Sequence, residues 1–250
     1  MLCQRPAARS EPMHSWSAAA TVLQMTSGTR IGASTVLALL LADVQPSMAA
    51  PSIPSVSRID VRTFRPVEGP KSGPEVYYKV VEEAGETMLR GSYQPGLETV
   101  VMGVEIPQAL RGRVRRVKWR WRARDFPVRG DECAPGGFGD STASVNVAFK
   151  RGFRWYVLKY VWSPLAPLGA VCDRKRTLFL VRDTIVLEHG GKPGTWLTEV
   201  VDARQAFIDH FAKGNPRADV PDMVGIGIMT DGDQTHSPSG ADWADFEIQY

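Results

Sequence analysis

The sequence predicts an all-β domain, a sandwich or a barrel of short strands, with one short helix. Runs of β-forming residues recur about every 8–12 residues and are bounded by Gly, Pro, Asp and Asn. Strands and helices do not alternate as they would in a doubly wound parallel sheet. Apolar residues make up 43% of the 250 residues and charged residues 23%, which is ordinary for a globular protein.

The first 50 residues are expected to direct export and to lie outside the fold. Residues 31–42 are uncharged, Arg30 precedes them, and small residues surround Ala49 and Ala50. This pattern is typical of a secretory signal peptide, and the apolar run is too short to span a bilayer. The alternative is a buried helix of a cytosolic protein. Because 24 residues precede Met25, we expect translation to start at Met25, with Met13 as the alternative, and the residues before the true start to be a misassigned extension.

Residues 51–58 are rich in Pro and Ser, which predicts a flexible lead-in, and residues 59–250 are expected to form a single domain. Its β-forming runs predict strands at 59–64, 76–81, 87–93, 97–105, 114–123, 144–150, 154–162, 177–181, 184–188, 196–201, 223–230 and 243–249.

One segment has helical periodicity. Asp202 is a suitable N-cap, with Gln205 three residues later. Gly214 and the following Pro216 are stop signals. We expect this helix to cover one edge or end of the sheets. The apolar and half-polar positions that share its face are Ala203, Ala206, Phe207, His210 and Phe211.

Two cysteines, Cys133 and Cys172, remain once residues 1–50 are removed. If strand 114–123 runs upward, the loop that follows it, which holds Cys133, lies at the top of the sheet. Strand 144–150 then runs downward and strand 154–162 runs upward again. The loop that holds Cys172 then lies at the same end of the sheet. An oxidising compartment favours a disulfide between the two, and the alternative is a pair of free thiols.

Strand 114–123 alternates strictly between tryptophan and basic residues. Period two places Trp119 and Trp121 on one face and Lys118, Arg120, Arg122 and Arg124 on the other. In one interpretation the arginines are solvated or paired with carboxylates of neighbouring strands. In the other, they form a basic stripe on a concave face that binds an acidic sugar or another anion.

Asn146 is expected on the same ligand-binding face, and Tyr160 and Trp162 could add rings that stack on sugars. In the run 224–230, Gly225 and Gly227 leave one face bare. A ligand could approach there, or the helix could pack there.

The turn that begins at Asp231 offers oxygen ligands at alternate positions, as a calcium loop does. Asp231 and Asp233 are the candidate ligands, and Asp242 stands at the twelfth position. His236 replaces the expected glycine at the sixth position. A turn held by bonds between side chains and its own backbone explains the same residues. No other cofactor is predicted.

Catalytic signatures are absent from the sequence. It contains no serine-hydrolase elbow, zinc-protease helix, Cys-x-x-Cys motif or Walker loop. No pair of carboxylates of the glycosidase kind stands out. The 30 basic and 27 acidic residues nearly balance, so charge gives no reason to expect a nucleic-acid partner.

Several segments together resemble an uncharacterised bacterial family, domain of unknown function 3047. They are TMLRGSY (87–93), VKWRWRA (117–123), LKYVWS (158–163), MVGIGIMTDGDQT (223–235) and ADWADFEI (241–248). The resemblance implies a jelly-roll-like antiparallel β-sandwich, similar to concanavalins and carbohydrate-binding modules. The family tends to have an Asp-Asp pair and an Arg where this chain has Gly139-Asp140 and Ser144, so part of a family site could be lost here.

From these features we expect a periplasmic or secreted monomer, not anchored in a membrane after cleavage, that binds a glycan or another polar or anionic ligand. One alternative is a polysaccharide hydrolase or lyase that uses Asp140, Asp231 or Asp233 as acid or base. Another is a structural or assembly partner in the envelope. The expected ligand-binding residues are Arg120, Arg122, Asn146, Tyr160, Trp162, Asp140, Asp231 and Asp233.

Overall fold

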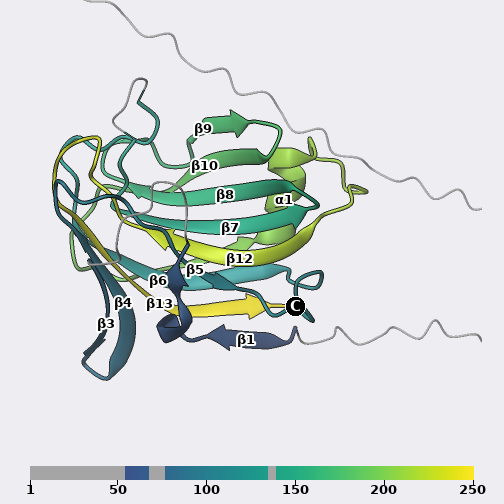
Figure 1. Ribbon diagram of the computed structural model, residues 1–250, viewed down its shortest axis with the longest axis horizontal. Helices are drawn as coiled ribbons and strands as arrows, with labels where there is room; N and C mark the ends of the chain where they lie inside the picture. Colours follow the sequence, from purple (N-terminus) through teal and green to yellow (C-terminus); the bar gives the residue numbers. More distant parts are fainter. Residues whose placement is uncertain (1–53, 68–76, 135–138) are drawn as a thin grey trace, which may run out of the picture. The chain divides into compact units, whose positions relative to one another are not determined.

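The computed structural model describes residues 54–67, 77–134 and 139–250. Residues 51–250 form one compact unit, in which two β-sheets stack with one helix between their ends (Figure 1). The expected signal peptide and residues 51–53 of the expected lead-in lie outside the described residues. Residues 56–58 of that lead-in belong to the first strand. Among the described residues, no helix is long and apolar enough to cross a bilayer.

The first sheet has six strands, all paired antiparallel. β13 is its central strand: one side pairs with β6, and the other pairs with β4 through residues 239–243 and with β1 through residues 246–249. The strands are β11 (Leu197–Asp202), β6 (Arg116–Asp125), β13 (Ser239–Gln249), β4 (Glu86–Tyr93), β3 (Tyr78–Glu83) and β1 (Val56–Ile59).

Among the described residues the second sheet has seven strands, of which β8 and β10 pair in parallel and the others antiparallel. A short 3-10 helix, η1 (Val61–Thr63), precedes it. In spatial order the strands are β2 (Arg65–Pro66), β5 (Met102–Glu105), β12 (Asp222–Met229), β7 (Ala143–Arg151), β8 (Arg154–Ser163), β10 (Leu180–His189) and β9 (Val171–Arg176).

The hydrophobic core lies between the two sheets. Trp119 and Trp121 of β6 are fully buried, and their rings lie 5.9 Å from Tyr160 and 5.8 Å from Trp162 of β8, respectively. Large aromatic side chains remove much apolar surface from water and therefore dominate the stabilisation of such a core. These contacts hold the sheets face to face and confirm the all-β, jelly-roll-like sandwich.

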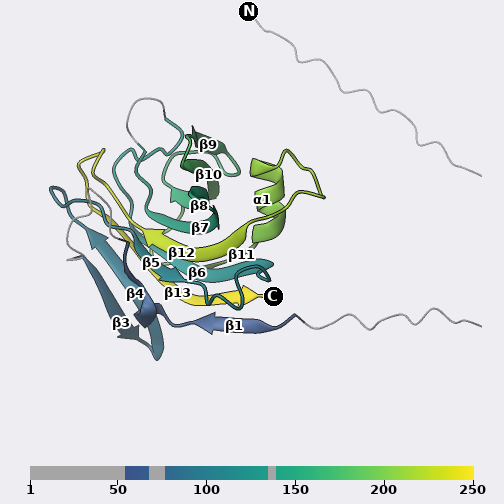
Figure 2. The same ribbon diagram turned by 45° about the vertical axis from the view of Figure 1, so that its right-hand side comes forward.

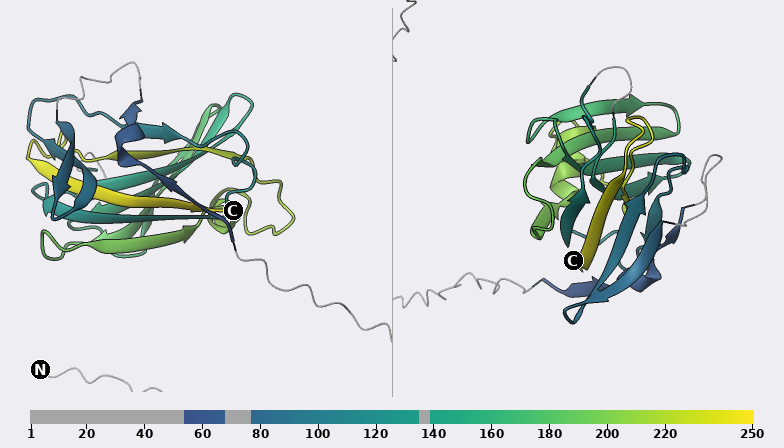
Figure 3. Two further views of the ribbon diagram at one scale, coloured as in Figure 1. Left: turned by 90° about the horizontal axis from the view of Figure 1, so that it is seen from below. Right: turned by 90° about the vertical axis from the view of Figure 1, so that its left-hand side faces the viewer.

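Helix α1 (Ala203–Phe211) confirms the one predicted helix. The Asp202 side chain accepts a hydrogen bond from the Gln205 N–H at 2.8 Å, as an N-cap does. Phe207 packs its ring 5.1 Å from Phe149 and 5.2 Å from Tyr156. The helix contacts β6 and β11 of one sheet and β8 of the other, and it covers one end of the sandwich (Figures 2 and 3).

Cys133 and Cys172 form the predicted disulfide, with their Cα atoms 5.2 Å apart. The expectation that both lie at the same end of the sheet is confirmed. In this structure the alternative of two free thiols is therefore excluded.

The strand predictions are wrong around β9 and β10. Residues 177–181 and 184–188 were expected as two strands, but residues 180–181 and 184–188 belong to the single strand β10, residues 177–179 form the turn before it, and β9 was not predicted. The charged pair at 182–183 resembles a turn in the sequence. Instead Asp183 is buried, and its carboxylate binds His210 Nδ1 at 2.9 Å and Arg176 Nη2 at 2.6 Å. The hydrogen bond from the helix and the ion pair with the neighbouring strand β9 allow this charge to be buried inside a strand.

The predicted strand ends also differ near the amino terminus. Strand 59–64 is replaced by β1, η1 and β2, and strand 97–105 is shortened to β5. Local β-propensity does not report which residues find a neighbouring strand to pair with, so it misses these ends.

Candidate functional site

Strand β6 presents its arginines on the outer face of the six-stranded sheet, because its tryptophans fill the core. Asp242 of β13 lies opposite Arg122 on one side and opposite Arg90 of β4 on the other. The basic stripe is therefore interleaved with carboxylates, as in the first of the two interpretations. We call Arg90, Arg122, Arg124, Asp242 and Glu83 the arginine cluster.

Asp242 is the centre of this cluster and its side chain is fully buried. Its Oδ1 accepts a hydrogen bond from Arg90 Nε at 2.7 Å, and its Oδ2 accepts one from Arg122 Nε at 2.7 Å. Glu83 Oε2 accepts hydrogen bonds from the Nη2 atoms of both arginines, each at 2.8 Å. These hydrogen bonds from Arg90 and Arg122 lower the pKa of Glu83.

Arg124 is the incompletely paired member of the cluster. Its Nη1 lies 3.9 Å from Asp242 Oδ1, which is too long for a hydrogen bond, and its side chain remains 35% exposed. Its guanidinium makes no hydrogen bond with any residue of the described segments. A pocket of about 370 Å³ opens there, lined by Glu83, Arg90, Arg122, Arg124, Pro193 and Gly194.

The cluster has three guanidinium groups and two carboxylates, and so carries one net positive charge. Trp196 lies beside the arginine cluster. The centre of its ring is 4.8 Å from the guanidinium carbon of Arg122 and 4.8 Å from that of Arg120. Arg120 itself is neutralised by Glu86 at 3.0 Å and Asp245 at 2.9 Å. Chemically, the pocket can accept a carboxylate or sulfate at its arginines.

A second unusual group, the acidic centre, consists of Asp140, Asp231 and Asp233. One carboxylate oxygen from each lies within 4.8 Å of the others. Asp140 is fully buried and accepts hydrogen bonds from the backbone N–H groups of Gln234 at 3.3 Å and Thr235 at 2.6 Å. The turn after β12 is thereby fastened to the segment before β7.

Burial is the main reason that the pKa of Asp231 is raised to about 7. Lys159 opposes this shift, whereas Glu132 and Asp140 add to it. Lys159 forms a buried ion pair with Glu132. The pKa of Asp233 is raised by partial burial and by Asp140.

Carboxylate oxygens in this arrangement are the ligand type that hard divalent cations prefer. The calcium-loop pattern, however, is wrong in one respect. Asp242, its expected twelfth position, is in the arginine cluster on the six-stranded sheet. The third carboxylate near Asp231 and Asp233 comes instead from Asp140, which the loop pattern does not include.

The structure does not bring the expected ligand-binding residues onto one face. Arg120 and Arg122 lie on the outer face of the six-stranded sheet, whereas Asn146 lies on the outer face of the other sheet, opposite Lys159. Tyr160 and Trp162 point into the core and cannot stack on a sugar there.

The cross-strand register gives the reason. Val145 is the partner of Tyr160, so the two side chains share a face. Val145 adjoins Asn146 in the strand and therefore faces the core, which places Tyr160 in the core as well. The register between the strands could not be derived from the alternation within one strand.

The bare face at Gly225 and Gly227 is on the outside of the seven-stranded sheet, with Asn146 beside Gly227. A Cβ on Gly227 would meet Val101 at 3.1 Å, and one on Gly225 would meet the Val104 carbonyl at 3.0 Å. No atom of α1 lies within this range, so the alternative that the helix packs on these glycines is wrong.

Sequence reasoning missed Arg90, Trp196 and the buried pair of Glu132 and Lys159. A signal existed for Trp196, because it begins a predicted strand whose alternation can be aligned with that of β6. No local signal existed for the others, because their partners are distant in sequence.

The profile of a family described as protein of unknown function (DUF3047) matches residues 63–247. None of the curated proteins matches this sequence.

Solved structures with a likeness to the chain include a family 11 carbohydrate-binding module from Clostridium thermocellum in complex with a mixed-linked tetrasaccharide. It has 9% identity and a TM-score of 0.39, and the match covers 79% of this chain and 96% of that one. Endoglucanase 3 of family GH12 from Trichoderma harzianum has 10% identity and a TM-score of 0.36, and the match covers 81% of this chain and 99% of that one. The xyloglucanase domain of NopAA, a type three effector from Sinorhizobium fredii, in complex with cellobiose, has 12% identity and a TM-score of 0.35. This match covers 80% of this chain and 97% of that one.

Proposed function

The chain belongs to the DUF3047 family, whose description names no function, and we propose that it binds an anionic glycan at the arginine cluster. The observation that carries this proposal is the guanidinium of Arg124. It faces a pocket, is 35% exposed, and lies 3.9 Å from a carboxylate that already accepts hydrogen bonds from two other arginines. A ligand carboxylate would supply the missing partner.

The surroundings of Arg124 favour a sugar acid over a small inorganic anion. The pocket is about 370 Å³ in volume, large enough for a sugar ring. Arg122, which lines the pocket, lies 4.8 Å from the centre of the Trp196 ring, so an aromatic side chain adjoins one of the lining residues. Aromatic rings cover the C–H faces of sugars while charged groups fix their orientation. Arg122 lines the pocket, and its hydrogen bonds to Asp242 and Glu83 fix its orientation.

We also propose that the protein acts outside the cytoplasm. The disulfide between Cys133 and Cys172 supports this, because disulfides persist in oxidising compartments. The signal-peptide pattern of residues 30–50 supports it independently.

Isothermal titration calorimetry with oligogalacturonate and with a neutral cello-oligosaccharide of equal length tests the proposal. We expect binding of the acidic oligosaccharide only. Arg124→Ala should weaken it roughly tenfold to a hundredfold, because a charge-assisted hydrogen bond contributes about 1.5–3 kcal/mol.

Arg154→Ala is the matched control, since Arg154 is an exposed arginine of the other sheet. It should leave the affinity unchanged. Equal affinity for the acidic and the neutral oligosaccharide, or equal losses in the two variants, would count against the arginine cluster as the binding site.

A further inference from the structure

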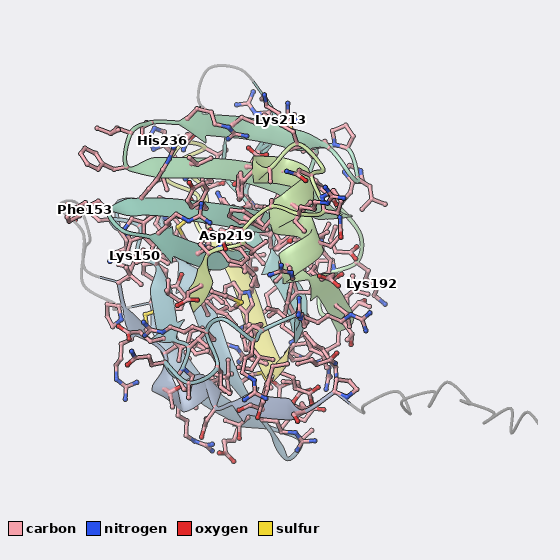
Figure 4. All side chains as sticks on the ribbon, turned by 90° about the vertical axis from the view of Figure 1, so that its right-hand side faces the viewer. Lys150, Phe153, Lys192, Lys213, Asp219 and His236 are labelled. Carbon is pink, nitrogen blue, oxygen red and sulfur yellow. A yellow bond between two sulfur atoms is a disulfide. The ribbon has the colours of Figure 1, made fainter. Side chains whose placement is uncertain are left out.

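Two neighbouring turns of the seven-stranded sheet expose large apolar side chains. The turn from β7 to β8 and the turn from β9 to β10 are joined by a hydrogen bond, which the Trp155 N–H donates to the Phe179 carbonyl at 2.8 Å. Phe153 is 89% exposed and marks the margin of the molecule near Lys150 (Figure 4). We call Phe153, Trp155, Leu178 and Phe179 the tip patch; the last three are 40%, 75% and 62% exposed.

Positive charge surrounds the tip patch. Lys150, Arg154 and Lys175 are exposed and have no ion pair with any residue of the described segments. Lys150 Nζ lies 4.7 Å from the centre of the Trp155 ring, so cation and aromatic ring adjoin directly.

The acidic groups near these turns do not cancel that charge. Asp219 pairs with Arg151 at 3.0 Å, and Asp183 pairs with Arg176. Asp222 lies opposite Lys150 in the ladder between β12 and β7, but the two form no ion pair. The apolar tip is therefore bordered by cations that form no ion pair with a described residue.

We propose that the tip patch docks this protein on a membrane surface that contains anionic lipids. Aromatic side chains with adjacent lysine and arginine are the combination favoured at the interface between lipid and water. Anionic headgroups attract the cations, and the acyl boundary accepts the apolar side chains. The patch consists of turn tips, and a lipid surface accepts such protrusions without a pre-shaped groove.

A second copy of the chain fits the patch less well. A two-fold interface would place each patch on its own counterpart and bring cations of equal charge together. Four side chains on two turns are also fewer than the 20–30 residues a side that stable interfaces typically use.

Co-sedimentation with vesicles tests the proposal. We expect the full chain to sediment with vesicles that contain phosphatidylglycerol and much less with phosphatidylcholine alone. High salt should release it, because salt screens the exposed cations. Combining Phe153→Ser with Leu178→Ser should lower the bound fraction at least tenfold, since each exposed apolar side chain that enters the interface contributes to binding.

Leu168→Ser is the matched control: Leu168 is 67% exposed but lies in the loop between β8 and β9. This variant should bind vesicles as the unaltered chain does. Quenching of Trp155 by brominated lipids, absent in Trp155→Phe, provides a second readout that reports insertion directly.

Three results would overturn the proposal. The chain could fail to sediment with either vesicle type. The Leu168→Ser variant could also lose binding as fully as the tip variant, which combines Phe153→Ser with Leu178→Ser. The tip variant could also convert a dimer to a monomer in analytical ultracentrifugation without changing vesicle binding, which would assign the patch to a second copy. The arginine cluster is on the other sheet, so glycan binding is tested separately.

Discussion

Glu199 illustrates how one residue can make the stability of this fold depend on pH. It lies on the core side of β11, opposite Trp119, and accepts a hydrogen bond from Trp121 Nε1 at 3.2 Å. Burial, together with the hydrogen bond and charge of Glu188 from the other sheet, raises the pKa of Glu199 to about 7. Two carboxyl groups that share a partly buried space are most stable when they hold a proton between them.

We therefore expect stability to decrease as the pH rises. A carboxyl whose pKa is higher in the folded state stabilises the fold fully below its unfolded value of 4.5, and this contribution is lost as the pH rises through about 7. Glu199→Gln removes the titration, so its free energy of unfolding should vary less across this range. Urea denaturation at a series of pH values measures the difference.

Glu98→Gln is the control, because Glu98 is an exposed glutamate of a loop. It should keep the pH dependence of the unaltered chain. If Glu199→Gln kept that dependence as well, the shared proton between Glu199 and Glu188 would be refuted.

At the residue scale, alternation within one strand was enough to place the tryptophans of β6 inside and its arginines outside. It was not enough to predict that Asp140 would join Asp231 and Asp233, because these residues come together only when two loops distant in sequence meet. The same limit applies to Arg90, whose partner Asp242 is 152 residues away.

At the scale of the elements, α1 was predictable because its cap, apolar face and stop signal are all local. β9 was not, because it is an edge strand, paired with β10 alone among the described strands, and it carries several charged residues. Edge strands have few local signals, and charges are common in them.

The disulfide fastens this edge strand to the loop that holds Cys133. The closed loop has a sequence separation of 39. Removing the link in the double variant Cys133→Ser and Cys172→Ser should lower the free energy of unfolding by about 2–4 kcal/mol. Guanidinium denaturation, with and without reductant, measures this change.

Reductant should destabilise the unaltered chain and leave the double variant as it was. We also expect the amides of β9 to exchange faster with solvent in the double variant, because the edge strand loses its covalent link. Unchanged stability after reduction would show that the strand ladder alone fixes β9.

At the scale of the whole molecule, both sheets contribute to one core. Trp119 and Trp121 come from one sheet, and Tyr160 and Trp162 from the other. Neither sheet can bury its aromatic side chains without the other, so residues 51–250 should unfold as one cooperative unit. Residues 1–50 should add nothing to that stability if they are removed during export.

A chain that begins at Pro51 tests this last expectation. Its thermal transition should be single, and it should coincide when followed by circular dichroism and by tryptophan fluorescence. Its midpoint should equal that of the protein purified from its native host, whose amino terminus should lie directly after Ala49 or Ala50 by mass spectrometry. The tryptophans report the core while circular dichroism reports both sheets, so two separate transitions would show that the sheets are stable independently and that the core does not unite them.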